Sequence, residues 1–130
     1  MPLAQSALDA GNEDLVHLLV SFGATFAWPD SDGRQPMHAV ASASDSPRRI
    51  EMLLAAGVAP DPLTPEGWTP LHFAAIYGYS SVVEALLGHK ADPCLTTRTG
   101  LSPADLARTN GHEILAERLE RACDERARGG

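Results

Sequence analysis

Apolar residues in the middle of the chain recur at helical spacing. Leu71, Ala74 and Ala75 are three and four residues apart, which places them on one face of a helix. Thr69 is a favoured N-cap residue, and Pro70 suits the first helical position because its missing N–H group is not needed there. The two alanines would let a neighbouring helix approach closely. The pattern therefore predicts a short helix that begins after Thr69.

A second apolar stripe follows one glycine later. Gly78 is expected to end the first helix, and Ser80 or Ser81 is expected to cap the next one. Four residues form the apolar face of this second helix: Val82, Val83, Leu86 and Leu87. Residues 88–100 are then rich in turn formers. The stretch predicts a helical hairpin followed by a protruding loop, a unit too small to bury its own apolar faces.

The same unit recurs along the chain with a period of about 33 residues. The residues that mark the starts and ends of its helices align in pairs: Gly67 with Gly100, Pro70 with Pro103 and Gly78 with Gly111. Upstream, Pro36 and His38 align with Pro70 and His72, but one residue is inserted within the segment 42–47. Stacking of such units would create the apolar core that one unit lacks.

Repeated units of this length with a T-P-L-H-like start resemble the ankyrin repeat. The resemblance covers residues 2–121 and is most complete in GWTPLHFAAIYG, residues 67–78. It implies an all-α solenoid of stacked helix-turn-helix repeats with protruding β-hairpin-like loops, in units of about 1–32, 33–66, 67–99 and 100–121. The positions that carry the signature are Pro36, His38, Thr69, Pro70, Leu71, His72, Gly78, Gly100, Pro103 and Gly111.

The end units differ from the middle ones as terminal repeats should. Polar residues occupy the first and last units where an outer helix face would meet water. In the last unit, Ala104 and Asp105 replace the Leu and His of the signature. Residues 122–130 are charged and end in two glycines, so we expect a frayed tail after a single domain of residues 1–121.

Composition excludes some classes of partner. The 130 residues carry a net charge of −7, and the first 33 contain acidic residues without any Lys or Arg. This balance argues against nucleic-acid or anionic-membrane binding and favours a partner protein with a basic patch. No apolar run reaches the roughly 18 residues of a membrane span, so we expect no membrane insertion. With only two cysteines and no signal-peptide pattern, we expect a reducing cytoplasmic or nuclear location.

The histidines and cysteines do not form a recognisable reactive constellation. His38 and His72 occupy the same repeat position, where the family resemblance implies structural hydrogen bonds to the neighbouring repeat. No histidine has a partner at HxxxH spacing. Cys94 is the best candidate nucleophile, but the sequence shows no base or orienting group for it. We therefore expect no enzyme activity, no cofactor and no metal.

The resemblance implies a protein-protein interaction module that binds a partner protein through its finger loops and the concave face of the first helices. Carried over position by position, the finger candidates are Trp28, Asp30, Asp32, Arg34, Leu63, Thr64, Glu66, Trp68, Thr96, Arg98, Thr99 and Leu101. On the first helices they are Asp9, Ala10, Ser42, Ala43, Ile76, Tyr77, Thr109 and Asn110. Aromatic and Arg side chains dominate binding hot spots.

Several alternatives remain at this level. Trp28 and Trp68 could instead cover loop backbone or the adjacent finger. The chain could be a regulatory or targeting segment of a larger enzyme or channel, or a scaffold that self-associates. A monomer is the primary expectation.

Overall fold

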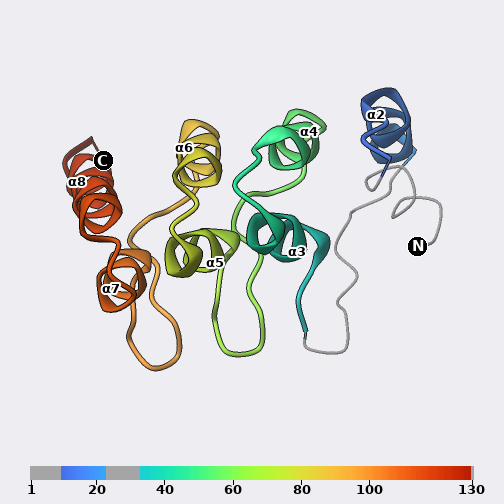
Figure 1. Cartoon of the computed structure of the whole chain (residues 1–130). Coiled ribbons are helices and arrows are strands. Elements are labelled where there is room, and N and C mark those ends of the chain that lie inside the picture. The colour runs from blue at the N-terminus through green and yellow to red at the C-terminus, as the bar shows by residue number, and fades with distance from the viewer. Residues whose placement is uncertain (1–9, 23–32, 130) are drawn as a thin grey trace.

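Helical hairpins stack side by side in the computed structural model, which describes residues 10–22 and 33–129 (Figure 1). One row contains the first helices of three units, α3 (Pro36–Ala43), α5 (Pro70–Tyr77) and α7 (Pro103–Thr109). The other row contains α2 (Glu13–Ser21), α4 (Arg48–Ala55), α6 (Ser80–Gly88) and α8 (Glu113–Gly129). The described residues include no strand, and the prediction of an all-α solenoid is confirmed.

The first helices begin and end at the expected residues. The Thr69 hydroxyl accepts a hydrogen bond from the His72 backbone N–H at 3.3 Å, and Pro70 opens α5. The helix ends at Gly78, whose φ of 73° lies in the left-handed region that favours glycine. A Cβ atom on Gly78 would also lie 2.6 Å from the His112 ring. Backbone conformation and close packing therefore both require glycine at this position.

The second helix of the third unit is capped from outside its own unit. Asp45 Oδ1 accepts hydrogen bonds from the backbone N–H groups of Ser81, at 2.9 Å, and Val82, at 3.3 Å. Ser80 lies within α6 and its side chain is not the cap, so the expectation of a Ser80 or Ser81 cap is wrong. Asp45 belongs to the segment with the one-residue insertion. The carboxylate of one repeat thus satisfies the helix start of the next.

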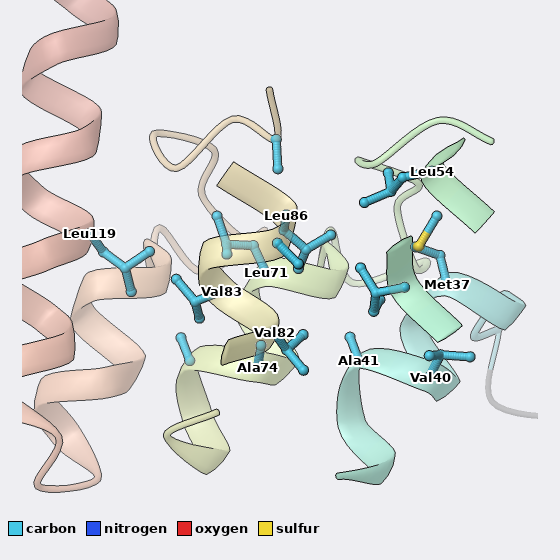
Figure 2. Close-up of a cluster of buried hydrophobic side chains, with 14 of the residues drawn as sticks. Met37, Val40, Ala41, Leu54, Leu71, Ala74, Val82, Val83, Leu86 and Leu119 are labelled. Carbon is cyan, nitrogen blue, oxygen red and sulfur yellow. The ribbon is translucent and has the colours of Figure 1, made fainter. Parts of the chain in front are cut away.

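The apolar core lies between the two rows of helices and continues from one unit to the next (Figure 2). Leu71 from the first row and Leu86 from the second are fully buried, as is Leu119 of α8. Ala74 and Ala75 are also fully buried, and their small side chains allow the first-row helices to approach closely. Each unit therefore completes the core of its neighbours, as a solenoid requires.

The C-terminal segment differs from the sequence expectation. Residues 122–129 continue α8 as a helix instead of forming a frayed tail. Cys94 and Cys123 form a disulfide with Cα atoms 5.2 Å apart, which removes the reason for assigning a reducing compartment from two unpaired cysteines. Neither cysteine spacing nor the charge of the segment signals this pairing, because it arises only when α8 extends past the end of the repeat.

Candidate protein-binding surface

The second finger, residues 59–69, and the third finger, residues 92–102, share one turn geometry. In the second finger, the Thr64 N–H donates to the Trp68 carbonyl at 3.0 Å and the Gly67 N–H donates to the Thr64 carbonyl at 2.9 Å. Thr97, Gly100 and Leu101 repeat this pattern in the third finger. The fingers are therefore hairpin-like loops, each closed by backbone hydrogen bonds and a glycine with positive φ.

The two buried threonines of the fingers, Thr64 and Thr97, are structural. Thr64 is only 5% exposed, and its Oγ1 atom accepts a hydrogen bond from the Trp68 N–H at 3.0 Å. Thr97, also 5% exposed, accepts from the Leu101 N–H at 3.2 Å. The expectation that Thr64 presents its side chain to a partner is therefore wrong, because this hydroxyl closes the turn.

Each finger is attached to its neighbours in the array. The Arg98 N–H donates to the Glu66 carbonyl at 3.0 Å, which joins the tip of the third finger to that of the second. The Arg98 guanidinium donates to the Pro65 carbonyl at 3.3 Å. A Cβ atom added at position 67 would lie 3.2 Å from the Arg98 backbone nitrogen, which is a tight contact. Glycine at this position therefore allows the two finger tips to approach without strain. The two fingers form one layer.

Two buried histidines fasten the fingers to the first-row helices. His72 Nδ1 accepts from the Thr69 N–H at 3.0 Å, so Nε2 carries the proton and donates to the Leu101 carbonyl at 3.1 Å. His38 Nε2 likewise donates to the carbonyls of Pro62 and Trp68, both at 2.9 Å. Burial lowers the pKa of His72, and its hydrogen bond to Leu101 offsets this only in part. The neutral imidazole suits a structural link.

In the last unit, Asp105 occupies the position that His72 has in the third unit, and it makes only one of the two hydrogen bonds of that histidine. Its Oδ2 atom accepts from the Ser102 N–H at 3.0 Å, as His72 Nδ1 does at Thr69. The Ser102 hydroxyl accepts from the Asp105 N–H at 3.1 Å, which completes a capping box. An ionised carboxylate accepts hydrogen bonds but donates none. Asp105 therefore cannot make the second bond, which His72 donates to a carbonyl of the following finger.

Trp68 forms part of an aromatic cluster at the base of the second finger. Its ring lies 5.0 Å from the Phe73 ring and 6.0 Å from the His72 ring. The Arg34 guanidinium lies 4.7 Å from the centre of the Phe73 ring, a cation–π distance. Trp68 is half-buried by these contacts. It covers the loop base, so it is a poorer candidate for partner contact than its residue type suggests.

Other candidates stay exposed. Tyr77 is 50% exposed, and its ring stacks on Tyr79 with centroids 5.5 Å apart. Leu63 and Leu101 are 55% and 38% exposed on the second and third fingers. We call the following exposed candidates the finger–helix surface: Leu63, Glu66, Tyr77, Arg98 and Leu101.

The remaining candidates differ in how free their side chains are. Ile76 is half-buried. Thr109 and Asn110 are exposed, but their side chains donate to the carbonyls of Asp105 and Leu106, each at 2.8 Å. The expected contacts Asp9, Trp28, Asp30 and Asp32 lie outside the described residues.

The described residues offer little for chemistry. Cys94, the candidate nucleophile, is in the disulfide. Within residues 10–22 and 33–129, no group of three His, Cys, Asp or Glu side chains could hold a metal ion. No helix in this part of the chain is long and apolar enough to cross a membrane.

Comparison with known proteins places these features in a family. A model of ankyrin repeats (three copies) matches residues 3–97 and again residues 39–124. A probable E3 ubiquitin-protein ligase of Oryza sativa subsp. japonica is 29% identical over 120 residues, covering 91% of this chain and 23% of that protein. Ankyrin repeat protein nuc-2 of Neurospora crassa is 32% identical over 122 residues, covering 93% of this chain and 11% of that protein.

A shorter match reaches higher identity. The ARF GTPase-activating protein Git of Drosophila melanogaster is 47% identical over 51 residues, covering 39% of this chain and 7% of that protein. The chain thus spans less than a quarter of the length of each of these relatives. The family match over most of the sequence, with the stacked hairpins and their histidine links, shows that this chain belongs to the ankyrin repeat family of protein-protein interaction modules.

Proposed function

We propose that this ankyrin repeat domain binds its partner protein through the finger–helix surface. The supporting observation is that the large side chains of Leu63, Tyr77 and Leu101 are exposed on the fingers and α5. In a domain this small, such side chains would be expected to contribute to the core. Tyr and Arg are enriched among the residues that supply most of the energy at protein interfaces, so Tyr77 and Arg98 are the main anchors of this surface and the two leucines surround them.

Rigid attachment makes these side chains effective contacts. The carbonyl of Leu101 accepts from His72, and the backbone of Arg98 bonds to that of Glu66. Such a surface is already ordered before it meets a partner, so binding loses little conformational entropy. The mechanism is presentation of a preformed surface by a stacked scaffold.

The acidic balance of the chain suggests the partner's charge. A net charge of −7, with Glu13 and Asp14 together at the start of α2, favours a partner with a basic patch and a monomeric domain in solution. The complex should therefore weaken as salt rises. Equal affinity at low and high ionic strength would remove the electrostatic part of the proposal.

A regulatory or targeting role within a larger protein is the second candidate. It is favoured by the lengths of the relatives, since the matching region makes up 23% of the rice protein and 7% of the fly protein. In that setting, the same surface would recruit a protein to, or hold it near, an activity located elsewhere.

The test compares capture by variants of the immobilised domain. Tyr77→Ala and Leu101→Ala should each lose a protein that the unchanged domain retains, whereas Ile114→Ala should keep it. Ile114 is a matched control because it is 86% exposed but lies on α8, in the other row of helices. Circular dichroism should show equal helix content in all variants. If Ile114→Ala abolishes capture and the other two do not, the binding surface lies elsewhere.

A further inference from the structure

The disulfide lies where the last helix passes the base of the third finger. Cys94 is in the third finger and Cys123 is near the end of α8, and both are partly exposed. They are the only cysteines of the chain. Their bond connects the extension of α8 to the previous unit.

The same extension replaces a contact that a further repeat would make. Asp61 Oδ2 accepts from the Asp92 N–H at 3.0 Å, a bond from one finger base to the equivalent place in the next. Asp92 Oδ1 in turn faces Arg126 Nε at 3.5 Å. Arg126 also donates to the Lys90 carbonyl at 3.4 Å. Residues 122–129 therefore form an end cap that supplies a guanidinium where a following unit would supply a backbone N–H.

Besides the disulfide, the end cap is held by the Arg126 contacts, which are weak. A hollow of about 240 Å³ lies between it and the end of α6, lined by Leu87, Pro93, Ala122 and Arg126 among others. The Arg126 side chain is 49% exposed, and ion pairs in such positions contribute little stability. Before the end cap, by contrast, α8 is anchored by buried Leu119. The covalent bond is thus the main fastening of the end cap.

We propose that Cys94–Cys123 is a thiol-sensitive latch for this end cap, a property that does not depend on the identity of any partner. A low-molecular-weight thiol attacks one sulfur, forms a mixed disulfide and releases the other sulfur, which takes up a proton. A second thiol then resolves the mixed disulfide. Two thiols lose two electrons and two protons to become one disulfide, and the protein gains two thiol groups.

Reduction should release only the end cap. The third finger keeps its own bonds, including the Leu101 carbonyl to His72 and the Arg98 N–H to Glu66. Neither bond involves the cysteines. Residues 122–129 would fray, and Asp92 would lose its Arg126 partner. In an oxidising compartment the end would remain closed.

Hydrogen exchange with mass spectrometry tests this directly on the full chain. In the oxidised protein, amides of residues 122–129 should be protected, and millimolar glutathione should speed their exchange about 10-fold or more, as expected for local opening. Exchange in residues 95–101 should remain within about 2-fold. Cys94→Ser with Cys123→Ser should show the fast pattern with or without glutathione.

Matched variants separate the sulfur bond from the ion pair. Arg126→Ala retains both cysteines and should keep the slow pattern until thiol is added. Two free thiols in the protein purified under air, or a disulfide that glutathione leaves intact in the native state, would overturn the proposal. So would fast exchange of residues 122–129 in the oxidised protein, because the latch would then hold nothing.

Discussion

Replacing Gly78 by Ala should destabilise the fold for two reasons. An alanine at φ 73° adopts the left-handed conformation, which costs about 1–2 kcal/mol for a residue with a Cβ. The new Cβ would lie 2.6 Å from the His112 ring, and moving this partly exposed ring adds up to about 1 kcal/mol of overpacking. We therefore expect a loss of about 1–3 kcal/mol in the free energy of unfolding.

Gly88→Ala is the same substitution at another position, but we expect it to raise the free energy of unfolding instead of lowering it. Gly88 is the last residue of α6, and a Cβ there would meet no atom within 4 Å. Alanine should raise stability by up to about 1 kcal/mol, because glycine loses more backbone entropy in a helix. Urea unfolding measures both effects. With a slope of about 2 kcal/mol per molar, a loss of about 2 kcal/mol lowers the midpoint by about 1 M. A Gly78→Ala midpoint equal to that of Gly88→Ala would refute the reasoning.

Three further predictions use the same urea assay. Leu86→Ala removes a fully buried side chain and should cost about 2–5 kcal/mol, and a cost below that of an exposed Leu63→Ala change would show that the core is misplaced. Asp45→Ala should cost about 0.5–2 kcal/mol through the lost cap of α6, with Ser44→Ala in the same loop as a control that stays near zero. Finally, the pKa of His72 is lower in the folded protein than in the unfolded chain. As pH falls below 6.5, the unfolded chain protonates this histidine before the folded protein does, so the free energy of unfolding decreases between pH 6.5 and the folded-state pKa. His72→Gln should remove that part of the slope.

Local patterns were sufficient to predict the repeated hairpins. Thr69 and Pro70 mark the start of α5, and Gly78 marks its end, because each residue acts on the backbone within one turn. The spacing of Leu71, Ala74 and Ala75 likewise places their buried faces correctly. These features need no knowledge of the neighbouring units.

Features that depend on distant neighbours were not predictable in the same way. The Asp45 cap acts across 36 residues, and the only local sign was an inserted residue in its loop. The disulfide spans 29 residues and exists only because α8 continues beyond the repeat length. Residue type left Trp68 as either an exposed anchor or a cover for loop backbone, and its contact with Phe73 depends on how the finger folds back over α5.

The histidine links recur in register, and this has a consequence for how the array can change in length. His38 bonds to the carbonyl of Trp68, and His72 bonds to that of Leu101, which is the equivalent position one unit later. If residues 67–99 were deleted, the Leu101 carbonyl would take the place of the Trp68 carbonyl. If they were duplicated, each copy would find the same acceptor. The gene can therefore lose or gain a whole unit in one recombination event without leaving a buried imidazole unpaired, whereas a partial unit would break the link.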